Sequence, residues 1–391
     1  MKTLNALSQQ NHKTDLVINF HITESCNYKC SYCYATWDDL EAKNELHRSP
    51  NKVASLLKNL ASYFLSDNSL KAKMGYENVR LNFAGGEPML LGKRFIDAIK
   101  FANQLGFKTS LITNGHYLSN DILDDIGPSL DVLGISYDSA NYDIAQKIGR
   151  VDRNNRWISA DDLRMICARY RALNSTGVLK LNTVVNAVNK DDSLLPLMTR
   201  IKPDKWKLLR VLPVYNHDLV ISQSEYLAYV NRHQALANII VEEDNDAMTH
   251  TYLMVNPEGR FYQNAEAGSG YVLSDLILAV GVEKALTQIP FDVSGFQQRY
   301  QLIPAVELSG EVTLLVKECD PIPDNLFSKI QDRIIDFQQS REQFSYWFKM
   351  KNGESIYYCR LNDNYRMVVE VKNKNTGPYE CMKHSTFDNR F

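Results

Sequence analysis

The sequence predicts an α/β fold: a partial (β/α)6 barrel of parallel strands, followed by a small α+β extension at the C-terminus. Short apolar runs alternate with amphipathic stretches up to about residue 250, the pattern of parallel strands joined by helices. Six such strand–helix units suit a partial barrel better than a closed barrel of eight. The length of 391 residues also exceeds one ordinary domain.

The barrel elements follow from apolar periodicity and from local start signals. Ser49 before Pro50 is typical of a helix N-terminus, with an N-cap residue followed by proline in the first turn. Strands are expected at residues 16–22, 79–83, 108–114, 132–138, 179–186 and 206–213, and helices near residues 50–66, 93–105, 119–127, 160–174, 191–200 and 222–237.

The pattern changes after residue 250. Residues 251–264 predict a hairpin around an Asn-Pro-Glu-Gly turn, and two short helices follow at 282–289 and 291–300. A helix near 324–341 and strands at 355–361 and 365–373 predict a separate module. The expected domains are therefore a barrel at 1–250, a segment at 251–304 and an extra α+β module of unknown role at 305–391.

Composition excludes several classes of protein. The formal net charge of −2 gives no overall attraction to nucleic acid or to acidic membranes, and no direct nucleic-acid binding is expected. No apolar run reaches the roughly 18 residues that a membrane span requires. The polar first fifteen residues do not resemble a signal peptide. These features predict a cytoplasmic protein without a membrane partner.

Three of the seven cysteines lie within eight residues, directly after the first expected strand. These are Cys26, Cys30 and Cys33, and clustered thiolates are the usual ligands of iron–sulfur clusters. Three thiolates leave one iron of a [4Fe-4S] cluster open to a ligand with an amine and a carboxylate, such as methionine. A zinc site completed by His21 or His47 is the alternative, although structural zinc usually takes four protein ligands.

The spacing CxxxCxxC, with Tyr32 before the last cysteine, and the sequence Gly85-Gly86-Glu87-Pro88 after the second strand resemble the radical S-adenosylmethionine (SAM) superfamily. This resemblance implies a TIM-type partial barrel, a [4Fe-4S] cluster and SAM as cofactors, and an electron donor protein as partner. The residues that match SAM-contacting positions of the superfamily are Tyr32, Gly85, Gly86, Glu87, Asn114, Ser136 and Arg150. Asp138 also ends the fourth strand, where polar groups of barrels face the active site.

Further segments, in order over roughly residues 15–303, resemble the viperin-like family of radical SAM enzymes. They include 135–150, 180–190, 202–214 and 277–286. The resemblance implies a lyase that dehydrates a ribonucleoside triphosphate to its 3′-deoxy-3′,4′-didehydro form, in anti-phage defence. The 5′-deoxyadenosyl radical would take the ribose 4′ hydrogen. Residues 251–304 would complete this core over the active site.

A triphosphate needs several converging cations, because phosphates are bound by Lys, Arg and backbone donors. Alternation along extended strands places Lys205 with Lys207 and Lys180 with Asn182 on common faces. The expected nucleotide-binding residues are Asn19, Arg80, Lys180, Asn182, Lys205, Lys207 and Arg210.

The chain departs from the family at several of these positions. Arg80 stands where Lys is expected, Lys205 where Arg is expected, and Ala84 where Ser is frequent, so CTP, UTP and GTP all stay open as substrates. Tyr300 matches loosely a flap over the nucleotide.

Two other functions stay open on the sequence. A radical SAM maturase of a ribosomal peptide would share the first cluster and the GGEP turn, but such enzymes usually carry a cysteine-rich C-terminal domain. Here Cys319, Cys359 and Cys381 are widely spaced. A zinc-stabilised binding protein without catalysis would hold zinc instead of iron.

Overall fold

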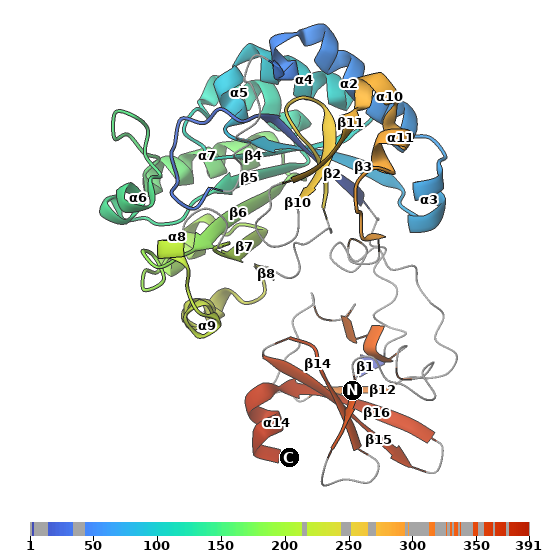
Figure 1. Ribbon diagram of the computed structural model, residues 1–391. Helices are drawn as coiled ribbons and strands as arrows, with labels where there is room; N and C mark the ends of the chain where they lie inside the picture. The colour runs from blue at the N-terminus through green and yellow to red at the C-terminus, as the bar shows by residue number, and fades with distance from the viewer. Residues whose placement is uncertain are drawn as a thin grey trace. The chain divides into compact units, whose positions relative to one another are not determined.

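Figure 1 shows the computed structural model of the chain. It describes residues 2–3, 15–33, 44–212, 217–243, 252–264, 271–293, 296, 313–316, 326, 329–330, 332–334, 337, 347–350, 356–362, 364–372 and 375–390. The chain divides into two compact units, Thr14–Arg299 and a smaller one made of Met1–Lys13 with Tyr300–Phe391. The barrel domain was expected to begin at residue 1. Met1–Lys13 instead group with the C-terminal unit.

The larger unit is built on one sheet of ten strands in the order β11-β10-β9-β2-β3-β4-β5-β6-β7-β8. All neighbours from β2 to β8 are parallel, and β9 is parallel to β2. The six expected strands are confirmed. They are β2 (Asp15–Thr23), β3 (Asn78–Gly85), β4 (Lys108–Thr113), β5 (Val132–Ser136), β6 (Val178–Val185) and β7 (Lys205–Arg210).

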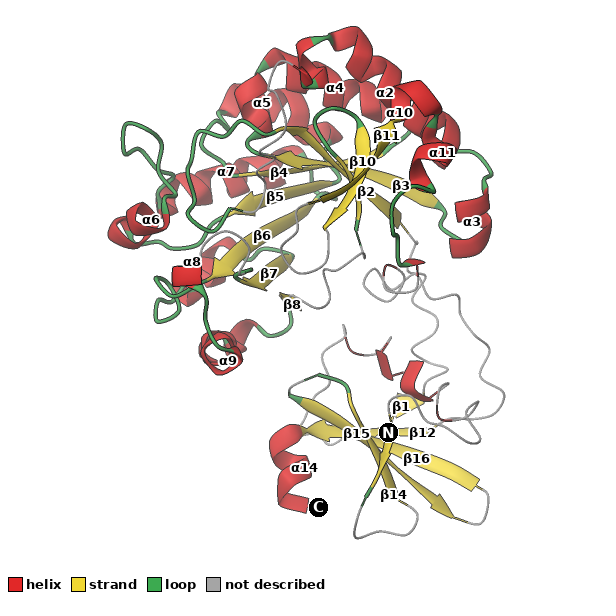
Figure 2. Ribbon diagram, viewed as in Figure 1, coloured by secondary structure: helices red, strands yellow, loops and turns green. Residues whose placement is uncertain are grey.

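Helices cover one face of this sheet, as Figure 2 shows. The helices found where the sequence predicted them are α2 (Pro50–Phe64), α4 (Lys93–Gln104), α5 (Asn120–Ile126), α7 (Ala160–Leu173), α8 (Leu195–Ile201) and α9 (Gln223–Arg232). Ser49 is the N-cap residue of α2 and Pro50 its first residue.

Several short elements were not predicted. They are α3 (Ser69–Met74), α6 (Tyr142–Ile148), β8 (Ile240–Glu243) and α10 (Ile277–Val280).

Alternation along the strands gives the sheet two chemically different faces. Phe83 of β3 contacts the ring of Phe95 in α4 at 5.5 Å, and Trp206 of β7 contacts His233 at the end of α9 at 4.9 Å. These apolar residues face the helices, so their neighbours Asn82, Lys205 and Lys207 face the opposite, inner side. The inner face of the barrel is therefore polar.

The predicted hairpin closes one edge of the sheet. It is formed by β9 (Leu253–Val255) and β10 (Arg260–Asn264), and β11 (Tyr271–Leu276) continues it. α11 (Val282–Leu286) replaces the longer helix expected at 282–289. Most of the helix expected at 291–300, including Tyr300, lies outside the described residues.

The smaller unit is a six-stranded sheet in the order β1-β12-β16-β15-β14-β13. Its strands are β1 (Lys2–Thr3), β12 (Thr313–Val316), β13 (Trp347–Lys349), β14 (Ile356–Arg360), β15 (Tyr365–Lys372) and β16 (Asn375–Lys383), followed by α14 (His384–Arg390). The expected strands at 355–361 and 365–373 are β14 and β15.

Phe337, Trp347, Cys359 and Cys381 are buried in one apolar cluster of this unit. Cys319 and much of the helix expected at 324–341 lie outside the described residues. In the part of the chain that is described, no helix combines the length and apolarity needed to cross a membrane.

Candidate active site

The three cysteines lie in the loop that leaves β2. Cys26 is exposed, whereas Cys30 and Cys33 are partly buried. Backbone hydrogen bonds fasten this loop to the end of α6: the Lys29 amide donates to the Gly149 carbonyl at 3.1 Å, and the Ser31 amide donates to the Ile148 carbonyl at 2.9 Å. The C-terminal end of α6 therefore holds the cysteine loop in place through backbone hydrogen bonds.

Gly149 makes this close approach possible. It has a φ of 85°, and a Cβ at this position would overlap the carbonyl oxygen of Lys29. Glycine alone combines the left-handed conformation with the missing side chain. Gly149 was not among the predicted site residues, although its position directly before Arg150 was a usable signal in the sequence.

A second set of contacts holds the first half of the loop. The side-chain amide of Asn114, which follows β4, donates to the side-chain oxygen of Asn27 at 2.7 Å. The Tyr28 hydroxyl lies 3.1 Å from Nδ1 of His116, and the Tyr28 amide donates to the Cys26 sulfur at 3.4 Å. Asn114 therefore orients the cysteine loop through Asn27.

The GGEP turn packs directly against the same loop. Gly85 has a φ of 124°, and a Cβ there would overlap the Thr23 carbonyl. The Gly86 and Glu87 amides donate to the carbonyls of Thr23 and Ser25, each at 2.8 Å. Since both amides are used within the protein, this turn is fixed against the start of the cysteine loop.

The Glu87 carboxylate is fully buried and accepts hydrogen bonds from three donors. The donors are the Thr113 hydroxyl (2.7 Å), the Asn114 amide (2.7 Å) and the Met89 amide (3.0 Å). Glu87 thus joins the ends of β3 and β4, which places the GGEP turn and Asn114 at one edge of the sheet.

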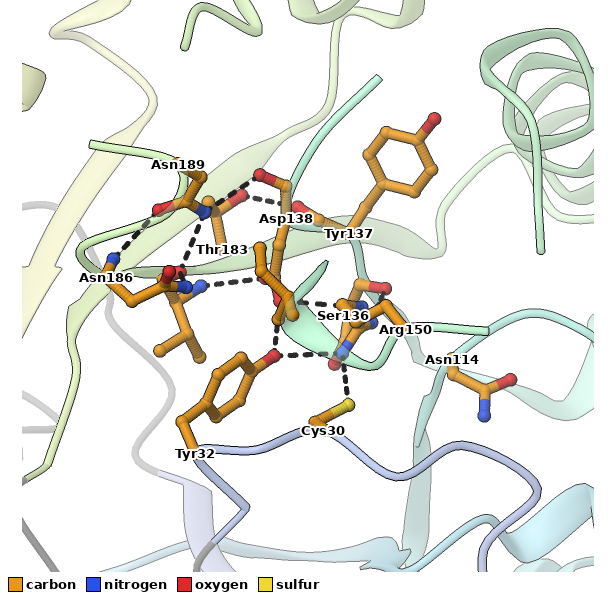
Figure 3. A network of polar contacts seen from close by, with 12 residues as sticks. Cys30, Tyr32, Asn114, Ser136, Tyr137, Asp138, Arg150, Thr183, Asn186 and Asn189 are labelled. Atoms are coloured by element: carbon orange, nitrogen blue, oxygen red, sulfur yellow. Dashed lines mark hydrogen bonds and ion pairs between the residues drawn. The ribbon is translucent and has the colours of Figure 1, made fainter. Parts of the chain in front are cut away.

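A network around Asp138 connects the second half of the loop to β5 and β6 (Figure 3). The Tyr32 hydroxyl donates to Asp138, and the Arg150 guanidinium lies 3.5 Å from the same carboxylate oxygen. Arg150 also donates to the Ser136 carbonyl, to the Tyr32 hydroxyl at 3.1 Å and to the Cys30 sulfur at 3.7 Å. The other Asp138 oxygen accepts from the Val184 amide at 2.9 Å.

The three thiols suit a cationic iron–sulfur cluster. Although the Cys26 residue is exposed, desolvation by the surrounding protein atoms raises the pKa of its thiol to about 12, and the nearby Glu87, Cys30 and Cys33 contribute to the increase. Burial also raises the pKa of Cys30. Such thiols become thiolates only when a cation compensates their charge, as a metal centre does.

The described residues include no group of three or more His, Cys, Asp or Glu side chains arranged around one metal ion. A four-iron cluster binds each thiolate at a different iron atom, so it does not need them to converge on one point.

The inner face of the barrel carries a hydrogen-bonded row of polar side chains. Arg80 donates to Ser110 at 3.0 Å, Ser110 donates to Asn82 at 2.7 Å, and Asn82 donates to Asn19 at 2.8 Å. Nδ2 of Asn19 and Oδ1 of Asn182 are buried without a hydrogen-bond partner. An unsatisfied buried polar atom costs about 1–3 kcal/mol, so a polar partner at either atom would be stabilising.

Lysines adjoin this row on β6 and β7. Strand pairing places Lys180 beside Lys205 and Asn182 beside Lys207. Lys205 is exposed, but desolvation by the surrounding protein atoms lowers its pKa, and the nearby Arg80 cation lowers it further. Lys207 donates to the Tyr252 hydroxyl at 3.2 Å. The structure thus brings Arg80, Lys180, Lys205 and Lys207 to the inner face.

Arg210 is the exception in the predicted nucleotide set. It lies on the same side of β7 as Trp206 and Leu208, and its guanidinium donates to Gln223, the first residue of α9, at 2.5 Å. An even spacing from Trp206 puts its side chain toward the helices. The expectation that Arg210 joins the other cations therefore needs correction.

Sequence reasoning also missed Glu45, which lies beside the loop, and it named His21 only as an alternative zinc ligand and not for its buried contact with Tyr262. Glu45 is buried and accepts from the Thr23 hydroxyl and the Glu24 amide, each at 2.8 Å. His21 lies 2.9 Å from the Tyr262 hydroxyl, and burial lowers the pKa of its imidazole to about 4. Partners so distant in sequence leave no local motif.

A three-cysteine loop after the first strand of a parallel partial barrel, beside a GGEP turn and a buried arginine, defines a radical SAM enzyme. Residues 20–192 match the family model described as the Radical SAM superfamily. A solved structure, native anSMEcpe with bound AdoMet and Kp18Cys peptide, is similar in fold. Its TM-score is 0.51 at 12% identity, over 73% of this chain and 82% of that chain.

The sequence relatives are more specific. A protein of Pseudoalteromonas ulvae, named S-adenosylmethionine-dependent nucleotide dehydratase, is 56% identical over 289 residues, which cover 74% of this chain and 94% of that protein. A protein of the same name from Psychrobacter lutiphocae is 36% identical, over 73% of this chain and 95% of that protein. The chain belongs to the viperin-like family of S-adenosylmethionine-dependent nucleotide dehydratases, a family that implies a [4Fe-4S] cluster and SAM.

Proposed function

We propose that this enzyme removes water from a ribonucleoside triphosphate and forms the 3′-deoxy-3′,4′-didehydro nucleotide. The observation that carries the proposal is one continuous inner face. It has the cysteine loop at the carboxyl ends of the strands, and unsatisfied asparagines and several cations farther down the same strands. The names of the relatives support the reaction.

We assign the binding of SAM to the residues at the carboxyl ends of the parallel strands, beside the cysteine loop. When bound, the reduced cluster and SAM supply a 5′-deoxyadenosyl radical that takes the ribose 4′ hydrogen. In this assignment Arg150 and Ser136 hold the SAM carboxylate, and the Gly85–Glu87 turn holds the amino group. Tyr32 borders the adenosyl part. Asp138 keeps Arg150 and Tyr32 in place through the contacts in Figure 3.

The nucleotide lies below SAM in this proposal. Arg80, Lys180, Lys205 and Lys207 bind the triphosphate, because their cations share the inner face. The unsatisfied Oδ1 of Asn182 accepts from a ribose hydroxyl, and Nδ2 of Asn19 donates to a ribose or phosphate oxygen. Both atoms would then gain the partner they lack.

The substrate in this proposal is CTP, UTP or GTP. The deciding experiment is anaerobic: the protein is reconstituted with iron and sulfide, reduced, and mixed with SAM and each ribonucleoside triphosphate in turn. We expect one nucleotide to lose the mass of water while 5′-deoxyadenosine forms, and we expect neither product from Cys30→Ala. 5′-Deoxyadenosine without any nucleotide product would contradict the proposal and favour a peptide substrate.

We further propose a cytoplasmic role in defence against phage. The product lacks the 3′ hydroxyl that a polymerase extends, so its incorporation would end a viral transcript. Cells that carry the gene should form fewer phage plaques than cells that carry the Cys30→Ala variant. Equal plaque numbers would refute this role and leave the chemistry intact.

A further inference from the structure

The outer edge of the cysteine loop is exposed and basic. Cys26, Lys29 and Ser31 are exposed, whereas Tyr28 and Arg150 on the other side of the loop are buried. Because the inner side faces the proposed SAM and nucleotide sites, the outer edge is the side of the metal centre from which another protein can approach it.

Three more exposed cations lie in the segment that packs against this loop. Lys147 lies in the last turn of α6, and Arg153 and Arg156 follow in the loop after it. The hydrogen bonds of Lys29 and Ser31 to Gly149 and Ile148 fix the end of α6 against the cysteine loop. We call Lys29, Lys147, Arg153 and Arg156 the basic edge.

The loop that carries Arg153 and Arg156 is ordered by one carboxylate. Asp152 is buried and accepts from the Asn154 and Arg156 amides, each at 2.8 Å, and it pairs with the Arg156 guanidinium at 2.7 Å. Asp152 also lies 3.6 Å from His116, whose ring contacts Tyr28 in the cysteine loop. The basic edge is thus held to the cysteine loop from two directions.

Most of this positive charge is not neutralised locally. Arg156 is paired with Asp152, but Lys29, Lys147 and Arg153 form no ion pair with any residue that the structure describes. A group of exposed like charges produces an electrostatic field. This field attracts oppositely charged molecules over about a Debye length, roughly 8–10 Å.

The proposed reaction needs electrons from outside. Nucleotide, SAM, two electrons and one proton give the didehydro nucleotide, 5′-deoxyadenosine, methionine and water. One electron cleaves the sulfonium of SAM, and the second reduces the nucleotide radical after the 3′ hydroxyl has left as water with the proton. A carrier of single electrons must therefore bind and leave twice in each turnover, which suits a small charged interface better than an apolar one.

We infer that the basic edge docks an acidic protein that carries one electron on a flavin or an iron–sulfur centre. This inference rests on the proposed function for its electron demand. The positive charge of the basic edge is complementary to the negative charge of such a carrier. The basic edge also adjoins the loop that holds the three cysteines. Surface charges of this kind raise association rates and make them salt-dependent.

The test measures reduction of the cluster and not formation of product. Reconstituted wild-type enzyme and the Lys147→Glu/Arg153→Glu variant are mixed with reduced acidic flavodoxin, and bleaching of cluster absorbance is followed by stopped flow. We expect the variant to be reduced roughly tenfold more slowly at low salt and to lose most of its salt dependence. Dithionite, which needs no docking surface, should reduce both proteins at the same rate.

The matched control is Lys73→Glu/Arg200→Glu, which changes the net charge equally. Both of these exposed residues lie near the ends of helices that precede strands, at the opposite end of the sheet from the cysteine loop. Its reduction by flavodoxin should match that of the wild type within about twofold. The neutral variant Lys147→Gln/Arg153→Gln should give an intermediate rate.

Unchanged reduction of Lys147→Glu/Arg153→Glu by flavodoxin, or an equal loss in the control variant, would overturn the inference. Because cluster reduction is observed without a nucleotide, failure of the proposed dehydration would show separately. In that case reduction through the basic edge would still occur, and the nucleotide assay alone would be negative.

Discussion

Asp138 is the residue on which the buried part of the site depends most. Its carboxylate is surrounded by the Tyr32 hydroxyl, the Arg150 guanidinium and the Val184 amide. A buried ion pair contributes little net stability, but the loss of one partner leaves the other charge uncompensated, at a cost of about 3–5 kcal/mol. Asp138 therefore determines where the Arg150 cation sits.

Asp138→Asn should separate this role from that of the tyrosine. We expect the substitution to destabilise the protein by roughly 3–5 kcal/mol, because Arg150 loses its counter-charge. SAM binding, measured by equilibrium dialysis, should weaken about tenfold, since the guanidinium is no longer held. Tyr32→Phe removes one hydroxyl and keeps the ion pair, so its loss of stability should stay near 1 kcal/mol. Equal effects of the two substitutions would contradict this account.

Residues on the two faces of β7 should differ in their effect on nucleotide affinity. Lys207→Ala should weaken binding of the accepted triphosphate by about tenfold or more, because a charge-assisted contact to phosphate is lost. Asn182→Ala, on the same face of the neighbouring β6, should weaken it less. Arg210→Ala is the matched control, because Arg210 faces α9 and contacts Gln223. Binding is measured by calorimetry at constant iron content, and a large loss in Arg210→Ala would show that the face assignment is wrong.

At the scale of elements, the backbone hydrogen bonds between the end of α6 and the cysteine loop can be tested directly. We call these contacts the clamp. Gly149→Ala should displace the loop, because the new Cβ would overlap the Lys29 carbonyl. The reconstituted protein should then hold clearly less iron than the wild type. Gly75→Ala is the control: Gly75 has a φ of 69°, but nothing lies within 4 Å of its Cβ position. Iron content is measured by metal analysis, and equal values in the two variants would refute the clamp.

The elements also show what the sequence alone allowed. The six strands from β2 to β7 coincide with clear apolar runs, so they were predicted with bounds within a few residues. The short α6 and β8 were not, yet α6 supplies the contacts that hold the cysteine loop. The face of Arg210 required the true register of β7, and the contacts of Asp138 and Glu45 join residues far apart in sequence.

At the scale of the whole molecule, the family relatives match only the larger part of the chain. The Pseudoalteromonas ulvae protein is covered over 94% of its length by 74% of this chain. About a quarter of the chain therefore has no counterpart in that relative. The smaller unit is also joined across the sequence, because β1 near the N-terminus pairs with β12.

A truncated protein of residues 14–299 should consequently keep the chemistry. We expect it to bind iron and to form 5′-deoxyadenosine at a rate within about threefold of the full chain, because the described site residues all lie in the larger unit. Residues 1–299 should be less soluble, since β1 would lose its partner β12. Loss of iron binding in residues 14–299 would show that the smaller unit supports the site.

The most direct test of the central claim follows one hydrogen atom. The accepted nucleotide is prepared with deuterium at the ribose 4′ carbon and incubated anaerobically with the reduced enzyme and SAM. We predict that 5′-deoxyadenosine gains one deuterium and that the dehydrated nucleotide retains none at that carbon. 5′-Deoxyadenosine without deuterium, formed while the nucleotide stays unchanged, would contradict the claim that this site acts on the ribose of a nucleotide.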